Sequence, residues 1–521
     1  MGPLLETRLK RLATPEMSGL LRGGLRGVER ECLRITPEGR VATTPHPLAL
    51  GSALTNEYIT TDYSEALLEF VTPPQVSNWE TVQLLCDIHQ FVINRIGDEL
   101  LWPLSMPCAI SSDKDVPLAE YGSSHIGMMK HIYRRGLGYR YGRTMQSIAG
   151  IHYNYSLPEA FWPRYQSLEN NADNLQDFQS AGYLSAVRNV RRLDWLLLYL
   201  FGASPAVCKT FVSGRGETGL EEFDAGTLFG PHATSLRMSD LGYHNTSQAR
   251  LKVSANSLDD YVADLHAATH VPSPAFDLIG VKVDGEYRQL NSNLLQIENE
   301  FYSTIRPKRV ARLGERPTEA LRRAGVQYVE LRALDISPWD PVGVNQRQMR
   351  FLEVFLIYCL LSSSPPISDD EQDAIDRNQA VVARRGREPG LRLRRGDDEI
   401  LLGDWAVEVC QGMTEVARLI DPDDSRGHVA AIGHHLSAIV DPEQTPSAAL
   451  LHTLRDTGLP LARYGLELAV RTRSYFEALA PELNRHRDRL IAEAASSLER
   501  QRALEAADTG TFDAYLESYL S

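Results

Sequence analysis

Two carboxylates stand two residues apart in a strand-like segment near the beginning of the sequence. The segment is GVERECLRI, in which Glu29 and Glu31 flank Arg30. Because successive side chains of a strand point to opposite faces, we expect Glu29 and Glu31 to share one face, about 6.6 Å apart. At an effective dielectric constant near 20, two like charges at that distance repel by about 2.5 kcal/mol. The pair therefore requires a cation, a proton or solvent, and a solvated edge strand with salt bridges is the alternative to a metal site.

Further acidic side chains and one histidine lie in other segments that alternate like strands. These segments are 62–71, 145–157 and 326–338. If each is extended, its polar residues share a face. Those residues are Glu65 and Glu69, then Gln146, His152 and Asn154, and finally Glu330 and Arg332, with Asp62 at the beginning of the first segment.

Several carboxylates with a single histidine suit a hard cation, Mg²⁺ or Mn²⁺, better than zinc. The six cysteines form no CxxC motif, so we expect neither a zinc site nor disulfides, only reduced thiols. Magnesium held by carboxylates indicates a nucleotide phosphate as its partner. No GxxxxGK[ST] segment is present, which excludes a P-loop. Cationic residues that could bind oxyanions instead are Arg237, Arg306, Lys308 and Arg332.

The overall charge disfavours nucleic acid as a partner. The net charge is -14, whereas neutralising phosphates requires a basic surface. The most apolar run, WLLLYLFGASPAVC (195–208), is shorter than the roughly 18 residues of a membrane span and contains Pro205. The first residues carry charges and have no apolar core typical of a signal peptide. We expect a monomeric cytoplasmic protein with small-molecule partners, no nucleic acid and no membrane.

The strand-like segments give way to helical patterns at about residue 346. NQRQMRFLEVFLIYCLLSS (345–363) has helical spacing, and residues 483–508 are good helix formers throughout. Between them, RRGREPGLRLRRGDDE (384–399) is interpreted as a solvated surface loop. No repeat or linker divides the chain. We therefore expect one catalytic domain over 1–521, with the sheet and site in 1–345 and mainly helices in 346–521.

Nine segments resemble the proteobacterial type of the glutamate–cysteine ligase family, and they occur in the family's order. They are RGVERECLR, ITTDYSEALLEFVTP, WPLSMPC, AEYGSSHIGMMKHIYRRGL, IAGIHYNYSLP, YLFGASPAVC, SLRMSDLGY, LQIENEFYSTIRPKR and VQYVELRALDISP. They cover the chain from about residue 20 to 350. The resemblance implies an α+β fold, with a curved, largely antiparallel sheet of the glutamine synthetase and guanidino-kinase type surrounded by helices.

The resemblance also implies a reaction. ATP would phosphorylate the γ-carboxylate of L-glutamate, and the amine of L-cysteine would attack the acyl phosphate to give γ-glutamylcysteine, the first step of glutathione biosynthesis. Feedback inhibition by glutathione is part of the same expectation. Three alternatives stay open: a related ligase using another amine, a guanidino-type phosphotransferase, and a catalytically silent binding protein.

Site roles follow from the matching motifs. The resemblance implies metal ligation by Glu29, Glu31, Asp62, Glu69, His152 and Glu330. It implies catalytic roles for Glu330 and Arg332, and phosphate binding by Arg306 and Lys308. It implies amino-acid binding by Tyr133, Arg134, Gln146, Asn154, Arg237, Tyr243 and Tyr302, of which the three tyrosines would form the cysteine pocket and Arg237 would bind a substrate carboxylate. Two residues depart from the family's pattern: Cys32 replaces a small hydroxyl residue, and His125 replaces asparagine.

Overall fold

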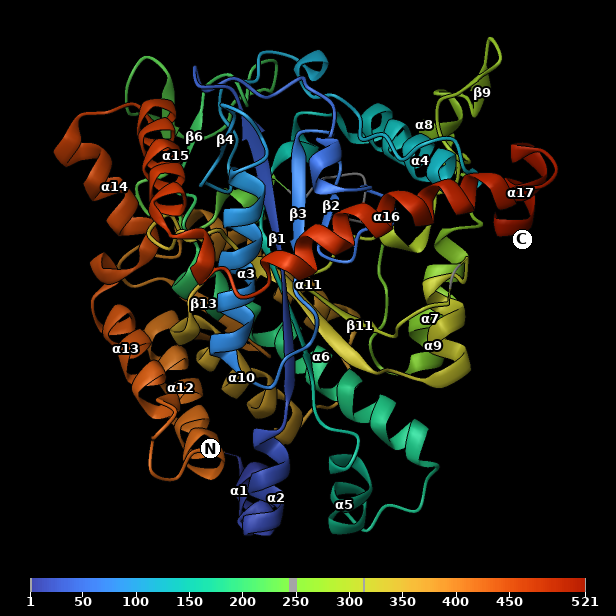
Figure 1. Ribbon diagram of the computed structural model, residues 1–521. Helices are drawn as coiled ribbons and strands as arrows, with labels where there is room; N and C mark the ends of the chain where they lie inside the picture. Colours follow the sequence, from blue (N-terminus) through green and yellow to red (C-terminus); the bar gives the residue numbers. More distant parts are fainter. Residues whose placement is uncertain (1, 243–250, 313, 521) are drawn as a thin grey trace.

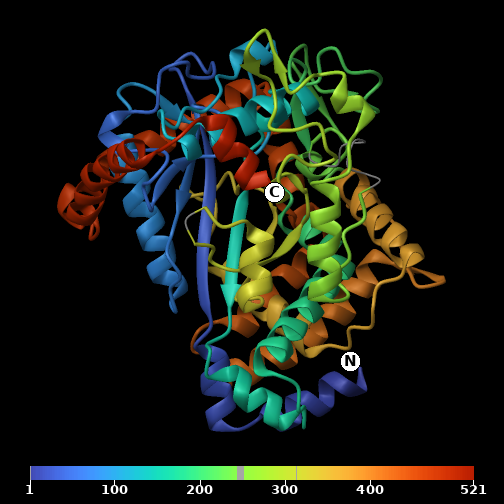
Figure 2. The same cartoon turned by 90° about the vertical axis from the view of Figure 1, so that its right-hand side faces the viewer.

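The computed structural model describes residues 2–242, 251–312 and 314–520, and within them a seven-stranded antiparallel sheet forms the centre of the molecule (Figures 1 and 2). The strand order is β11-β12-β5-β1-β3-β2, and β4 pairs with the end of β1. The expected mixture of helices and antiparallel sheet is confirmed. The strands are β1 (Leu25–Ile35), β2 (Ile59–Thr61), β3 (Leu67–Val71), β4 (Leu100–Leu101), β5 (Ile151–Ser156), β11 (Ile305–Lys308) and β12 (Tyr328–Leu334).

The register of this sheet brings polar residues from four strands together. Directly opposed residues of antiparallel neighbours project to the same face, with their Cβ atoms about 5 Å apart. The central strand β1 contributes two such residues, one toward β5 and one toward β3. The opposed pairs are Glu29 with His152, Glu31 with Glu69, and Glu330 with Asn154.

A layer of helices packs against the sheet and forms the core with it. Helices α3 (Asn78–Ile93) and α6 (Leu175–Phe201) contact the strands, and α10 (Gln346–Leu361) packs against both helices. On β1, Val28 and Cys32 alternate with the two glutamates and are fully buried. The Cys32 thiol contacts the guanidinium of Arg30, so the residue that departs from the family pattern lies inside this core. Alternation along β1 thus separates an apolar face from a polar one.

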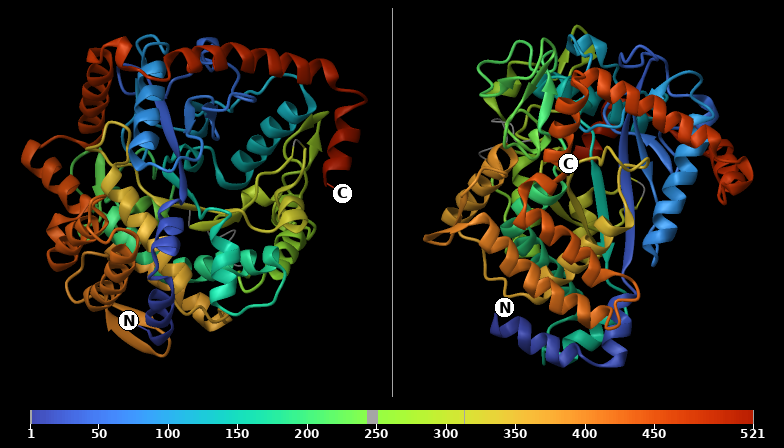
Figure 3. Two further views of the ribbon diagram at one scale, coloured as in Figure 1. Left: turned by 60° about the horizontal axis from the view of Figure 1, so that its bottom comes forward. Right: turned by 90° about the vertical axis from the view of Figure 1, so that its left-hand side faces the viewer.

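The remaining helices surround this centre (Figure 3). Before β12 they are α1 (Pro3–Leu12), α2 (Pro15–Arg22), α4 (His125–Tyr141), α5 (Phe161–Leu168), α7 (Leu258–Ala268), α8 (Pro274–Asp277) and α9 (Pro317–Ala324). After β12 they are α11 (Asp369–Arg385), α12 (Leu402–Ile420), α13 (His428–Val440), α14 (Pro446–Thr457), α15 (Leu461–Ala478), α16 (Arg487–Ala507) and α17 (Phe512–Leu520). One connected cluster of buried residues runs from Leu5 to Ala494. None of the described helices is long and apolar enough to cross a membrane.

The chain's last helix packs against the helix that bears several expected site residues. Helix α17 contacts α4, and Figure 3 shows α16 leading to it across the molecule. His125, the first residue of α4, lies against Phe512 and Tyr515 of α17. Its backbone N–H donates to a carboxylate oxygen of Asp508. The second departure from the family pattern therefore lies at this contact.

Seven short strands form three small sheets outside the central one. They are β6 (Ala206–Cys208), β7 (Glu221–Glu222), β8 (Thr227–Phe229), β9 (Lys282–Val283), β10 (Glu286–Tyr287), β13 (Arg392–Arg395) and β14 (Asp398–Leu401), counting the β6-β8-β7 sheet and two hairpins. The hairpin β13-β14 corrects the interpretation of 384–399 as a loop. Its turn contains Gly396 at φ +61°, and Leu393 is buried beneath it. The many charged residues of this segment indicated a loop because they hide the single apolar residue that packs inward.

Two predicted strands begin later than the alternation indicated. Residues 145–147 form a 3-10 helix, and β5 begins only at Ile151, because a carboxylate oxygen of Glu31 accepts the N–H of Gly150 at 2.6 Å. Glu65 lies in the turn before β3. Its two carboxylate oxygens accept backbone N–H groups of His46 and Glu120, so it holds loops together.

The expectation of six reduced cysteines is wrong for one pair. Cys108 and Cys208 form a disulfide, with Cα atoms 5.5 Å apart. Because 100 residues separate them in sequence, spacing along the chain could not indicate the pairing. The four other cysteines, all within the described residues, are free thiols.

Candidate active site

A cavity of about 240 Å³ lies over the polar face of the sheet. It draws its walls from β1, β3, β5, β11 and β12 and from α4. All the residues expected to bind metal line it, and they are Glu29, Glu31, Asp62, Glu69, His152 and Glu330. Their convergence follows from the strand register, which places neighbours of three adjoining strands over one another.

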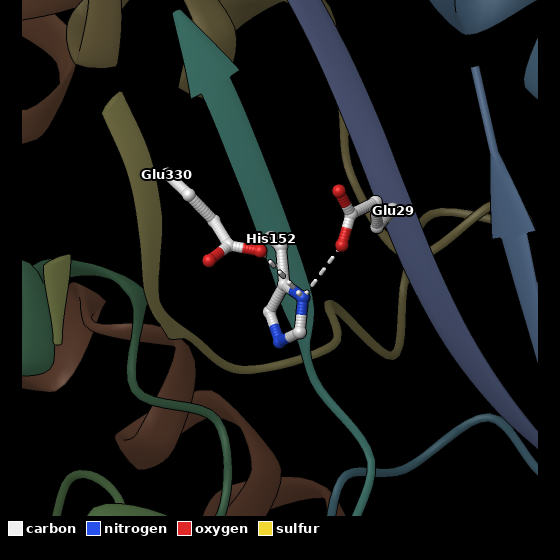
Figure 4. Close-up of side chains that lie close together, drawn as sticks. All are labelled: Glu29, His152 and Glu330. Atoms are coloured by element: carbon white, nitrogen blue, oxygen red, sulfur yellow. Dashed lines mark hydrogen bonds and ion pairs between the residues drawn. The ribbon is translucent and has the colours of Figure 1, made fainter. Parts of the chain in front are cut away.

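His152 is the centre of this carboxylate cluster (Figure 4). Its Nδ1 lies 3.0 Å from Glu29 Oε2 and 3.9 Å from Glu330 Oε1. Its Nε2 lies 3.5 Å from Glu31 Oε1. The imidazole is nearly buried, with 4% of its side chain exposed. One histidine thus touches carboxylates from three directions.

The carboxylates of the cluster have pKa values displaced in opposite directions. Burial is the largest influence on Glu29 and would raise its pKa, but the hydrogen bond and charge of His152, together with the charge of Lys308, bring the pKa below the ordinary value. Burial raises the pKa of Glu69 well above the ordinary value, and the charges of Glu29 and Asp62 raise it further. The pKa of Glu31 is raised mainly by burial. Such a set of repelling groups is stabilised by added positive charge.

The cluster fits a hard divalent cation. Glu29, His152 and Glu330 each offer one ligand atom, and these atoms lie within 4.8 Å of one another. Glu31 and Glu69 supply further oxygens in the same cavity. Carboxylate oxygens with one imidazole match the preferences of Mg²⁺ and Mn²⁺, whereas thiolates, which favour softer metals, do not line this cavity among the described residues.

Positive side chains border the cluster on β11 and β12. Arg332 Nη1 lies 3.2 Å from Glu330 Oε1, and Lys308 Nζ lies 3.4 Å from Glu330 Oε2. Burial would raise the pKa of Glu330, but Lys308 and Arg332 hold it well below the ordinary value. Arg306 lines the same cavity, and its Nη2 donates to the carbonyls of Asn299 and Phe301. These cations lie beside the carboxylates, so an anionic ligand in the cavity could contact the cations directly and the carboxylates through a bound metal ion.

Four of the seven residues expected to bind amino acids line the same cavity as the carboxylates. Tyr133, Arg134, Gln146 and Tyr302 line the same cavity, and Gln146 Nε2 lies 2.9 Å from the Tyr302 hydroxyl. Tyr243 lies outside the described residues. Asn154 does not line the cavity but donates from Nδ2 to Glu29 Oε1 at 2.8 Å, which orients that carboxylate.

Arg237 lines a smaller, adjoining cavity of about 70 Å³, which shares His152, Tyr302 and Arg332 with the larger one. Its Nη2 donates to the carbonyl of Arg332 at 2.9 Å. A side chain at position 150 would collide with this guanidinium, so Gly150 leaves room for it. We call this cavity the Arg237 cavity.

Several residues around the Arg237 cavity were not predicted from the sequence. Asp335 is buried beneath it, and its Oδ1 lies 3.7 Å from Arg237 Nη1. Thr304 and Gln379 line the cavity, and Asp194 bonds to both. Asp194 and Asp335 stand in apolar sequence surroundings, WLLLYLF and LRAL, and this is the signal that could have singled them out. Gln379 lies on an ordinary helical stretch with no such signal.

Comparison with known proteins matches this architecture to one family. The family model described as glutamate-cysteine ligase matches residues 9–382. Glutamate–cysteine ligases of Alcanivorax borkumensis and Pseudomonas putida KT2440 are 47% and 48% identical over 521 residues, covering 99% and 100% of this chain and 99% and 98% of theirs. The crystal structure of glutamate–cysteine ligase from Francisella tularensis in complex with AMP superposes with a TM-score of 0.89 at 36% identity, covering 96% of this chain and 97% of that one. The chain therefore belongs to the glutamate–cysteine ligase family.

Proposed function

We propose that the protein joins the γ-carboxylate of L-glutamate to the amine of L-cysteine and converts one ATP to ADP and phosphate. The product would be γ-glutamylcysteine, from which glutathione is built. The observation that carries the proposal is the convergence of carboxylates and cations in the cavity over the sheet, in a chain whose relatives over the full length are named glutamate–cysteine ligase. The relative solved with AMP supports an adenine nucleotide as the phosphoryl donor.

The cluster around His152 is proposed to hold Mg²⁺ or Mn²⁺. Its ligands would come from Glu29, Glu31, Asp62, Glu69, His152 and Glu330. When bound, such a cation neutralises charge on the ATP phosphates. Asn154 would keep Glu29 in place through the hydrogen bond to Oε1.

Lys308 and Arg332 are proposed to bind the transferred phosphoryl group. The Lys308 ammonium on β11 and the Arg332 guanidinium on β12 both line the cavity, with 29% and 23% of their side chains exposed. Glu330 orients them by accepting one contact on each of its oxygens. Positive groups fixed in this way stabilise charge on a phosphoryl group in flight without having to reorganise. Arg306 would add charge behind them.

Two bond changes complete the proposed reaction. An oxygen of the γ-carboxylate attacks the terminal phosphorus, and ADP leaves. The cysteine ammonium first loses a proton to solvent; the neutral amine then attacks the acyl carbon, and phosphate leaves with that oxygen while the second proton lost by the nitrogen goes to the phosphate or solvent. Arg237 is proposed to bind a substrate carboxylate, and Tyr133, Tyr302 and Tyr243 to form the cysteine pocket, with Gln146 and Arg134 at its wall.

Finer features of the fold are proposals of the same kind. We infer that the sheet is of the glutamine synthetase and guanidino-kinase type, supported by an antiparallel sheet that carries its carboxylates on one face. We also infer a single catalytic domain over 1–521, supported by the connected core from Leu5 to Ala494. Inhibition by glutathione and a monomeric state stay predictions.

One experiment separates this function from its alternatives. The protein is given Mg²⁺ and ATP with glutamate, with cysteine, or with both, and both ADP and dipeptide are measured. We expect one ADP per γ-glutamylcysteine, and fast ADP release only when both amino acids are present. ADP release without dipeptide would favour a phosphotransferase, and faster turnover with another amine would favour a related carboxylate–amine ligase. A folded protein that makes no dipeptide contradicts the proposal.

A further inference from the structure

The Arg237 cavity has a second wall that carries no charge. Thr304, just before β11, and Gln379, on α11, line it together with Arg332, whose backbone N–H donates to the carbonyl of Thr304, and less than a tenth of each residue is exposed. Neither belongs to the residues that the sequence motifs marked for substrate binding. The C-terminal helical part of the chain therefore reaches the site through Gln379.

One buried carboxyl group organises this wall. Asp194 Oδ2 accepts the hydroxyl of Thr304 at 2.8 Å and the Nε2–H of Gln379 at 3.0 Å. Asp194 lies on α6, which packs against β11 and β12, and only 2% of it is exposed. The hydroxyl hydrogen of Thr304 and one amide hydrogen of Gln379 are thus directed away from the cavity.

The consequence is a wall of hydrogen-bond acceptors. With its hydrogen directed to Asp194, Thr304 offers oxygen lone pairs to a ligand. With Nε2 turned to Asp194, Gln379 presents its carbonyl Oε1, which accepts no hydrogen bond from any described residue. Both hydrogen bonds are made to Oδ2, so this polarity holds whether or not Oδ1 carries a proton, and burial raises the pKa of Asp194 to about 8.

The two walls of the cavity together match the head of an α-amino acid. Arg237 and Arg332 supply positive charge for a carboxylate, and the acceptors of Thr304 and Gln379 face a group that donates several hydrogens. An α-ammonium is such a donor, and it stands one carbon from the carboxylate. A cavity of about 70 Å³ is small enough to exclude a nucleoside.

The chemistry of the reaction decides which amino acid this is. The cysteine amine must lose a proton and reach the acyl carbon, so a subsite that holds an ammonium through acceptors would oppose its attack. The α-ammonium of glutamate does not react. Because the cavity shares His152, Tyr302 and Arg332 with the larger one, a glutamate held here can extend its γ-carboxylate toward Glu330 and the phosphoryl site.

We propose that Thr304 and Gln379 bind the α-ammonium group of the glutamate substrate and that Asp194 is the positioning residue that makes both present acceptors. This inference rests on the proposed ligase function. A purely structural Asp194 network would affect folding and all substrates alike, whereas an ammonium subsite affects only ligands that carry the ammonium.

The test compares glutamate with glutarate, which lacks only the α-amino group. The quantity measured is the ratio of kcat/KM values for the two acids, from ADP release in the presence of cysteine and Mg-ATP. In Gln379→Leu we expect the preference for glutamate to fall about tenfold to a hundredfold, the usual worth of a hydrogen bond to a charged group. Asp194→Asn should also lower the preference for glutamate. The asparagine amide can donate a hydrogen bond to Thr304 or Gln379, which would then turn a hydrogen toward the cavity instead of an acceptor oxygen.

Gln372→Leu is the matched control. Gln372 lies on the same helix, donates to Asp376 Oδ1 at 2.8 Å, and lines neither cavity. It should keep the wild-type ratio. If the leucine variant of Gln379 does not fold, Gln379→Met, unbranched like glutamine, replaces it.

The outcomes separate this inference from the proposed function. A wild-type protein that makes no dipeptide contradicts the function itself. A wild-type protein that makes it, together with a Gln379 variant that keeps the wild-type ratio, overturns the ammonium subsite alone. An equal loss of kcat/KM for both acids also leaves the ratio unchanged and therefore overturns it too.

Discussion

His152 Nδ1 lies 3.0 Å from Glu29 Oε2, and the two residues are directly opposed across β1 and β5. The same nitrogen lies 3.9 Å from Glu330 Oε1 on the next strand. Strand register therefore sets the spacing of these three side chains, each of which lies on a strand. Sites built on strands in this way are rigid, so changes of charge within the cluster should have sharp effects.

Replacing Glu29 with glutamine should nearly abolish activity. The change keeps the side-chain volume but removes a charge, and we expect kcat to fall about a hundredfold or more because phosphoryl transfer depends on charge neutralisation. The stabilisation that Mg-ATP gives should shrink as binding weakens. Without ligands the variant should melt slightly lower, because the ionised Glu29 is stabilised by His152. Wild-type turnover in this variant would contradict a role at the phosphates.

Replacing Glu69 with glutamine should have the opposite effect on stability while also lowering activity. A carboxyl group whose pKa is raised on folding binds more protons in the folded state, so its contribution to stability falls as pH rises above its ordinary value of 4.5. The metal-free Glu69→Gln variant should therefore gain in Tm over wild type as pH rises from about 4.5 toward 7. Melting curves across this range test the sign. Glu57→Gln is the control: Glu57 is exposed, so its Tm difference from wild type should not change with pH. If Glu69→Gln instead lost Tm relative to wild type increasingly as pH rises, Glu69 would not be a buried carboxylate repelled by its neighbours.

Arg237→Ala should separate the substrates kinetically. Loss of a guanidinium that binds a substrate carboxylate should raise the KM for glutamate about tenfold or more and leave the KM for ATP near its wild-type value. Steady-state series in each substrate measure both. If only the KM for ATP changes, Arg237 binds the phosphates of ATP and not a substrate carboxylate.

Asp335→Asn should reproduce part of the Arg237 effect from beneath the cavity. The Asp335 carboxylate accepts the N–H of Ala203 and the hydroxyls of Ser204 and Ser235, and its Oδ1 faces Arg237. An amide at this position loses the charge that holds the guanidinium, so we expect the KM for glutamate to rise severalfold at nearly constant KM for ATP. Asp340→Asn is the control, since Asp340 follows the same strand but lines neither cavity. A parallel change in both variants would indicate a general loss of structure.

Alternation along a strand predicted the most about this site. It placed Glu29 and Glu31 on one face, and the sheet has them opposite His152 and Glu69. Alternation could not show where β5 begins. The N–H of Gly150 donates to the Glu31 carboxylate just before the strand, and Gln146 lies in a 3-10 helix further upstream. The convergence of strands on one cavity came only from the family resemblance, since register is a property of pairs of strands.

Contacts between distant parts of the chain stayed invisible to sequence patterns. The bond from Gln379 to Asp194 joins residues 185 positions apart, and the disulfide joins residues 100 apart. The first depends on how α6 and α11 pack together and the second on how the loop after β4 meets β6, and no local spacing encodes either contact. The residues missed from the sequence are therefore Asp194 and Asp335, which support the site from beneath, and Thr304 and Gln379, which line the Arg237 cavity.

The path of one oxygen atom tests the central claim most directly. L-Glutamate labelled with ¹⁸O in both γ-carboxylate oxygens is converted with cysteine and Mg-ATP, and the phosphate released is examined by mass spectrometry. Activation as γ-glutamyl phosphate predicts that each phosphate carries one ¹⁸O and that the new amide retains the other. Unlabelled phosphate, released in step with dipeptide, would contradict phosphorylation of the γ-carboxylate and with it the role assigned to this cavity.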